Sequence, residues 1–319
     1  MQRVLTTVTL LGLLVATAAA FAITEHLKLE KSPLFAVQIS AGAAPAIHPG
    51  GLVVISPICH CPTDVARVGF SLRHPDHVTV MFVDSAGHTV ATRPESLLRA
   101  HIPQHVDWDG RTDSGALVPD GVYFPAVHLA NARHTFQFAN KITVDTQPPR
   151  VVSATRLKPV LLGGAGQSLA IQYRFSERAH ALVYLDGRRI VVGHESRPQS
   201  KIKWTGRLEG EPLRPGTYVL SIGARDLAGN ETPAGERKQV TVVLRYIEIT
   251  PELITVRRGR PFTVHVETAS RHYTWRLGRR HGGGRGKTLR LRPPSTPGTY
   301  RLVVAENGHA ATAVVRVHK

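Results

Sequence analysis

Two thiols and an imidazole lie in three consecutive residues, Cys59-His60-Cys61, which contain the only cysteines of this 319-residue chain. Three kinds of chemistry fit these groups. The thiols can form a local disulfide, which persists in an oxidising compartment. They can bind zinc or copper together with the imidazole and a fourth ligand from elsewhere, or they can remain as free thiols. We expect the disulfide between Cys59 and Cys61, with no bound metal or cofactor.

A second candidate site is the acidic group Asp107, Asp109 and Asp113. Oxygen ligands at alternate positions suit calcium, but an EF-hand loop also needs Gly at its sixth position and Glu at its twelfth, and this segment has neither. A related segment replaces Asp109 and Asp113 with Thr205 and Glu209. We therefore expect these aspartates to serve in turns, where the side chain bonds its own backbone.

Basic residues gather in the segment 276–292, in a chain whose net charge is +17. A strong positive field favours anionic partners, although an arginine-rich composition explains the charge equally well. The segment surrounds Gly282-Gly283-Gly284 and predicts a flexible basic hairpin tip. A solvated face is the simpler interpretation of its charge, and docking on acidic envelope polymers or anionic lipids is the sharper hypothesis. No specific nucleic acid is expected. The seven residues are Arg276, Arg279, Arg280, Arg285, Lys287, Arg290 and Arg292.

No group of residues indicates catalysis. The 17 histidines are scattered along the chain, and neither a His-Glu-x-x-His nor a Gly-x-Ser-x-Gly motif occurs. No general acid, base and nucleophile come together in sequence. We therefore expect a protein without enzymatic activity.

The elements that position these residues are predicted to be β-strands. The run 78–83, the turn 84–88 and the start of a return strand at Thr89 indicate a hairpin. Asp186-Gly187 separates two further apolar runs in the same manner. Short strands with turn residues between them, at spacings of about 8–12 residues, are typical of a β-sandwich.

One aromatic sequence motif recurs along the chain. Trp108-Asp109-Gly110-Arg111 is followed by Tyr123, and Trp204-Thr205-Gly206-Arg207 is followed by Tyr218, each Tyr lying just after a Pro and a Gly. A fainter copy ends at Tyr300. A motif that recurs about once per hundred residues indicates a duplicated module. We expect Trp108, Tyr123, Trp204 and Tyr218 to be structural anchors that pack across two sheets.

The N-terminal run Val4–Thr24 contains no charged residue and is long enough to cross a membrane as a helix. We favour an uncleaved signal-anchor, with cleavage near Ala18-Ala19-Ala20 as the alternative. In both cases the rest of the chain lies outside the cytoplasm. The predicted organisation is a signal-anchor or signal peptide (1–24), a juxtamembrane stalk (25–50) and three modules (51–147, 148–245 and 246–319).

Several segments occur in an order that resembles a known family. Ile55-Ser56-Pro57, residues 65–72, residues 84–90, Trp108-Asp109-Gly110-Arg111 and residues 119–123 follow one another as in the Ig-like domain of the flagellar hook-capping protein FlgD. The resemblance covers about residues 51–145. It implies a β-sandwich without catalytic residues, and it does not imply a flagellar role. The second module resembles the same family, and the third resembles generic bacterial Ig-like modules.

Together these observations predict an all-β chain of three tandem Ig-like β-sandwiches after an N-terminal transmembrane or signal helix. The expected function is a non-catalytic scaffold or adhesion protein, anchored in the bacterial cell membrane with its bulk outside the cytoplasm. The expected partner is an anionic envelope polymer or a protein. Two alternatives remain open, a flagellar or surface-appendage assembly factor and a thiol or metal-binding protein that uses Cys59-His60-Cys61.

Overall fold

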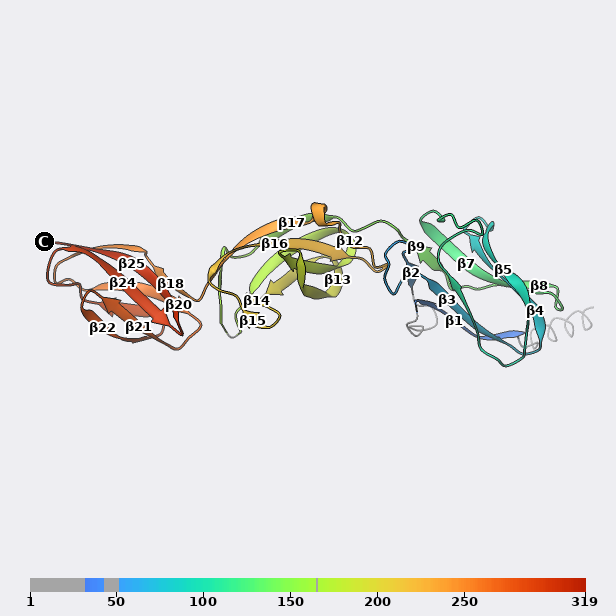
Figure 1. Ribbon diagram of the computed structural model, residues 1–319, viewed down its shortest axis with the longest axis horizontal. Coiled ribbons are helices and arrows are strands. Elements are labelled where there is room, and N and C mark those ends of the chain that lie inside the picture. Colours follow the sequence, from blue (N-terminus) through green and yellow to red (C-terminus); the bar gives the residue numbers. More distant parts are fainter. Residues whose placement is uncertain (1–31, 43–51, 165) are drawn as a thin grey trace, which may run out of the picture. The chain divides into compact units, whose positions relative to one another are not determined.

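The computed structural model describes residues 32–42, 52–164 and 166–319, and the regular secondary structure of these residues consists of β-strands apart from one short 3-10 helix (Figure 1). The predicted N-terminal segment 1–24 lies outside the described residues. Among the residues that are described, none belongs to a helix long and apolar enough to cross a membrane. The strands form sheets around three separate hydrophobic cores.

The first sandwich packs a three-stranded sheet, in the order β1-β3-β6, against a sheet in the order β2-β9-β7-β4-β5, with β8 paired to β7. The predicted hairpin at 78–90 is confirmed, because β4 pairs with β5 in antiparallel fashion. The strands are β1 (Leu34–Ala41), β2 (Val53–Ile55), β3 (Ala66–Leu72), β4 (Asp76–Asp84), β5 (Thr89–Leu98), β6 (Gln104–Trp108), β7 (Gly121–Leu129), β8 (His134–Gln137) and β9 (Ile142–Val144).

Strand β1 corrects the predicted stalk. Residues 34–41, which the sequence analysis assigned to a stalk at 25–50, pair with β3 as an edge strand of the first sandwich. Leu34 and Ile39 from this strand are buried in the first core. The prediction of a loose stalk was therefore wrong for this segment, because its apolar side chains cover the end of a sheet.

The second sandwich is built around two long, bent strands. The register of β12 shifts between Arg174 and Ala179, so that its first half pairs with β10 and its second half with β16. Asp186 and Gly187 both have positive φ at the β12–β13 turn, as a type I′ hairpin requires, which confirms that predicted turn. The elements are β10 (Val151–Arg156), β11 (Val160–Leu162), β12 (Leu169–Leu185), β13 (Arg188–Trp204), β14 (Arg207–Leu208), β15 (Glu211–Pro212), β16 (Gly216–Arg225), the short 3-10 helix η1 (Ala234–Glu236) and β17 (Lys238–Arg245).

The third sandwich packs a three-stranded sheet, β18-β20-β23, against a five-stranded sheet, β19-β25-β24-β21-β22 (Figure 1). Along most of these strands, buried or half-buried side chains alternate with exposed ones, as expected where one face of a sheet covers a core. The strands are β18 (Ile247–Thr250), β19 (Leu253–Arg257), β20 (Phe262–Thr268), β21 (His272–Leu277), β22 (Arg280–Arg285), β23 (Thr288–Leu291), β24 (Gly298–Glu306) and β25 (His309–His318).

All three sandwiches share one further feature, a parallel pair that includes the last strand. The last strands β9, β17 and β25 pair in parallel with β2, β11 and β19, respectively. The remaining pairs of named strands in the described chain are antiparallel. The same order of sheet partners three times over indicates that one module was repeated.

The chain divides into two compact units, Met1–Asp145 and Thr146–Lys319. The first unit contains one hydrophobic core, and the second contains two. Trp108 and Trp204 are among the largest fully buried side chains of the described residues. The tryptophan anchors that the sequence predicted therefore lie in the first and second cores.

Candidate functional site

The repeated motif forms the same corner in each sandwich, a turn that is closed by the hydroxyl of its tyrosine. In all three copies the tyrosine hydroxyl donates a hydrogen bond to the backbone carbonyl four residues earlier. Tyr123 bonds Pro119 at 2.7 Å, Tyr218 bonds Arg214 at 2.7 Å and Tyr300 bonds Thr296 at 2.8 Å. Burial raises the pKa of Tyr123, so this hydroxyl remains a donor at neutral pH. The corner fixes the chain where it enters the next strand, which is a structural role.

The two tryptophans complete this corner in the first two sandwiches. The indole nitrogen of Trp108 donates to the carbonyl of Arg111 at 2.9 Å, and that of Trp204 donates to Arg207 at 3.2 Å. Each indole meets the corner tyrosine edge to face, with ring centroids 5.2 Å apart for Trp108 and 6.0 Å apart for Trp204. Because the indole nitrogens already have partners inside the loop, neither tryptophan is presented to a ligand.

The third sandwich uses a leucine at the same place, which the sequence analysis did not recognise. Trp108, Trp204 and Leu291 are each the last residue of their strand. Each also pairs with the first residue of the partner strand, namely Ala66, Leu169 and Phe262. This strand register identifies Leu291 as the counterpart of the two tryptophans. The residues around Leu291 lack the aromatic motif, so the sequence alone does not reveal it.

The aspartates around Trp108 do not converge on a common point. Asp107 accepts two hydrogen bonds of 2.7 Å from Arg67, and this guanidinium holds the pKa of Asp107 below its ordinary value. Asp109 lies 3.8 Å from Arg111, and Asp113 accepts a hydrogen bond from the backbone of Thr92. The three carboxylates are engaged separately, so the arrangement is that of turn residues and does not suit calcium.

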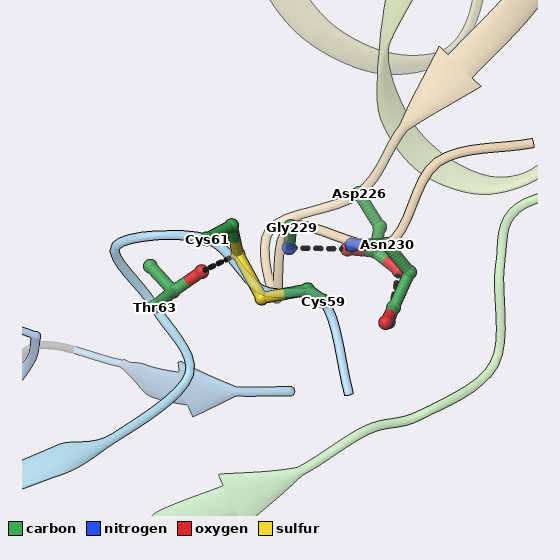
Figure 2. The surroundings of a disulfide bond; sticks show 6 residues. All are labelled: Cys59, Cys61, Thr63, Asp226, Gly229 and Asn230. Carbon is green, nitrogen blue, oxygen red and sulfur yellow. Dashed lines mark hydrogen bonds between the residues drawn. A yellow bond between two sulfur atoms is a disulfide. The ribbon is translucent and has the colours of Figure 1, made fainter. Parts of the chain in front are cut away.

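Cys59 and Cys61 are joined by a disulfide, with an S–S distance of 2.00 Å (Figure 2). The sulfur of Cys61 lies 3.1 Å from the hydroxyl of Thr63. His60, between the two cysteines, is exposed and adopts a positive φ of 49°. Since a disulfide sulfur carries no thiolate charge, this loop offers a metal no thiolate ligands in its oxidised form.

We expect the double variant Cys59→Ser/Cys61→Ser to remain folded and to lose at most about 1.5 kcal/mol of unfolding free energy, because the closed loop is so short. Mass spectrometry of the non-reduced peptide should show the two cysteines linked within one chain. Calorimetry with and without a mild reductant measures the stability difference. Two thiols that alkylate without reduction, or stoichiometric zinc or copper, would contradict the disulfide.

The seven basic residues of 276–292 do not form one cluster. All seven are exposed, but Arg276 lies on the outer face of the five-stranded sheet and Arg290 on the outer face of the opposite sheet. Arg280 and Arg285 occupy opposite ends of β22, about 16 Å apart at the usual rise per strand residue. The remaining three, Arg279, Lys287 and Arg292, lie in the segments that connect these strands.

The predicted flexible tip at Gly282-Gly283-Gly284 is wrong. These glycines lie inside β22, where they pair with β21, and the turn of this hairpin is at Gly278 and Arg279 instead. Three consecutive glycines are typical of a loop, but here the neighbouring strand supplies the side chains that an all-glycine segment lacks.

Two aromatic rings of β21 cover this glycine strand. Trp275 is paired with Gly282, and Tyr273 is paired with Gly284. A Cβ on Gly284 would overlap the Tyr273 ring, and the indole nitrogen of Trp275 donates to the carbonyl of Gly283 at 3.3 Å. Gly282 and Gly284 are therefore required for the rings to lie across the edge strand, which explains two of the three glycines without any ligand.

The topology and the repeated corner define this chain as a tandem array of Ig-like β-sandwiches. No known family profile matches the chain, and no curated protein matches its sequence. Among solved structures it is similar to the three-domain fragment I67-I69 of titin, at 11% identity over 90% of this chain and 99% of that one, with a TM-score of 0.29.

Two bacterial structures are similar to a comparable degree. One is an ice-binding adhesin of 1.5 MDa, described for host cell surface retention, at 12% identity over 90% of this chain and 99% of that chain, with a TM-score of 0.29. The other is the fibronectin(III)-like modules of CbhA from Clostridium thermocellum, at 13% identity over 65% and 92%, with a TM-score of 0.31. These values are too low to carry an argument about function.

Proposed function

We propose that this protein is a non-catalytic scaffold or adhesion protein of the bacterial cell envelope, anchored by Val4–Thr24 with its bulk outside the cytoplasm. Its modules would follow the predicted boundaries at 147 and 245, with the first module beginning at β1. The observation that carries the proposal is the corner repeated in three sandwiches. The residues that recur in all three are used internally, so the repeat serves to build an array of modules.

The disulfide supports a location outside the cytoplasm. Disulfides form and persist in secreted and periplasmic proteins, whereas cytosolic thiols are kept reduced. The bond between Cys59 and Cys61 closes a surface loop of the first sandwich. A protein secreted after signal cleavage would meet the same conditions, so the disulfide supports the compartment and does not distinguish an anchor from a cleaved signal.

Protease added to intact protoplasts should digest residues 32–319, because the proposed anchor places them outside the membrane. Immunoblotting with an antibody against the C-terminal sandwich measures the loss of the full-length band. A cytoplasmic marker protein in the same sample should stay intact as the control. Full protection until the protoplasts are lysed would overturn the proposed topology.

A role as a flagellar or surface-appendage assembly factor is the second candidate. It is favoured by the resemblance of residues 51–145 to the Ig-like domain of FlgD. The segments of this chain that carry the resemblance lie in one sandwich, around Trp108. Co-purification of hook or pilus subunits with the full chain would support this role. The thiol or metal-binding alternative requires Cys59 and Cys61 to be reduced first.

A further inference from the structure

Four arginines form a diagonal stripe on the outer face of the five-stranded sheet of the third sandwich. Arg257 lies on β19, Arg316 on β25, Arg301 on β24 and Arg276 on β21, and all four are exposed. From each arginine to the next, the path moves one strand across and two residues along. The register is set by the pairs Thr255 with Arg316, Val314 with Arg301, and Val303 with Arg276.

The spacing of the stripe follows from sheet geometry. Neighbouring strands lie about 4.8 Å apart, and two residues along a strand span about 6.7 Å, so successive arginine Cα positions are about 8 Å apart. The four positions therefore cover about 25 Å in an almost straight line. Because the step of two residues keeps every side chain on the same face, all four guanidinium groups extend to the same side of the sheet.

This face carries charge of one sign. Along the five strands, the outward positions hold five arginines and three histidines and no aspartate or glutamate. Within the described residues, none of the four stripe arginines lies within ion-pair distance of a carboxylate. Their donors are thus available to an external anion. The outward basic residues are Arg257, His272, Arg276, His281, Arg285, Arg301, Arg316 and His318.

The stripe leads into a hollow at one end. A cleft of about 370 Å³ is bordered by Arg276 and His281, with Val303 and Ala305 on its apolar side. The next cleft along β21 is bordered by the carboxylate residue Glu306, which extends from the inner face of β24. An anion that follows the stripe is therefore expected to end at Arg276 and His281.

We propose that the arginine stripe, Arg257, Arg276, Arg301 and Arg316, binds an extended linear phosphodiester polymer of the cell envelope. The proposal rests on the proposed function, which places the protein in the cell envelope. It adds the polymer as the partner of the proposed scaffold. A row of single charges fits a chain with one phosphate per repeat better than a broad anionic surface. Arginine, which supplies every stripe position, binds phosphate through two parallel hydrogen bonds.

The test compares the full-length parent in detergent with two charge-matched variants. The stripe variant is Arg257→Thr/Arg276→Thr/Arg301→Thr/Arg316→Thr, in which threonine preserves strand preference. The control variant replaces Arg279, Lys287, Arg290 and Arg292 with Thr. It loses the same number of positive charges, but at positions outside the stripe. Binding to poly(glycerol phosphate) is measured by isothermal titration between 50 and 200 mM salt, with dextran as the uncharged polymer. Calorimetric melting shows whether each variant is folded.

Four phosphate contacts on a single-stranded polyanion predict that the affinity of the parent falls about 50-fold between 50 and 200 mM salt. The control variant should keep this salt dependence. The stripe variant should bind at least about tenfold more weakly at 50 mM salt and lose most of the salt dependence. Equal losses in both variants, or no loss in either, would overturn the stripe as the binding surface.

Three further outcomes separate the partner from the scaffold proposal. Stripe-dependent binding of poly(dT) in addition to poly(glycerol phosphate) supports phosphodiester recognition. Stripe-dependent binding of poly(dT) alone, or of phosphatidylglycerol vesicles alone, overturns the envelope polymer as the partner. The protoplast experiment is independent of polymer binding, so an exposed protein that binds no polymer would refute the stripe proposal and leave the envelope scaffold standing.

Discussion

Replacing Trp108 with alanine should unfold the first sandwich selectively. The side chain is fully buried, stacks on Phe82 with ring centroids 4.6 Å apart and meets Tyr123 edge to face. Truncating a buried aromatic residue costs about 3–5 kcal/mol of unfolding free energy. For a module of this size, such a loss lowers the melting temperature by at least about 12 °C. Scanning calorimetry of the full chain would record it.

The other two tryptophans provide matched controls. Trp204→Ala should lower a transition of the second compact unit, Thr146–Lys319, and leave that of the first unchanged. Trp275 is only half-buried, on the strand next to the sheet edge, so Trp275→Ala should cost no more than about 2 kcal/mol. An unchanged melting profile for Trp108→Ala would show that this ring does not support the first core.

The second large effect is expected at Gly110, in the loop that follows Trp108. Gly110 has a φ of 66°, and a Cβ built on it would overlap the Pro57 ring. A left-handed alanine costs about 1–2 kcal/mol, and overpacking against the Pro57 ring adds about 1–3 kcal/mol. Gly110→Ala should therefore destabilise the first sandwich by about 2–5 kcal/mol in chemical denaturation.

Gly115 is the matched control in the same loop. It also has a positive φ, 83°, but a Cβ there would meet no atom within 4 Å. Gly115→Ala should therefore show the backbone cost alone, about 1–2 kcal/mol. If the two variants lose the same stability, the contact between Gly110 and Pro57 contributes nothing, and only the left-handed backbone matters.

Local signals in the sequence were sufficient to predict the hairpins and the tryptophan anchors. Asp186-Gly187 predicts its turn because those two residues accept positive φ with little strain. Trp108 and Trp204 predict buried anchors because each is a large ring followed by a Gly-containing turn and then by a Tyr at nearly the same spacing. Each of these predictions depends on residues that are close together in the chain.

Strand β1 was missed because its pattern is irregular. Its register shifts between Phe35 and Gln38, and Ala36 has a positive φ. The alternation of apolar and polar residues is therefore broken in the middle of the strand, and only Leu34 and Ile39 are fully buried. Periodicity of two, the main sequence signal for a strand, does not detect such an edge.

The arrangement of the basic residues in space was not predicted, for a related reason. Sequence analysis groups residues that are adjacent in the chain, and it therefore selected 276–292. The sheet register instead aligns Arg276 with arginines that lie up to 40 residues away, at positions 257, 301 and 316. Strand register is decided by tertiary packing, and a single sequence does not reveal it.

The parallel pair that closes each sandwich determines how the fold responds to a mechanical load. In the third sandwich, β19 and β25 run side by side in the same direction from Leu253 paired with Val314 to Arg257 paired with His318. A pull on the chain at both ends draws such strands along their axes in opposite directions. The ladder bonds are then sheared together and do not open one after another. The bonds of each parallel pair are therefore expected to resist such a load as a set and not one after another.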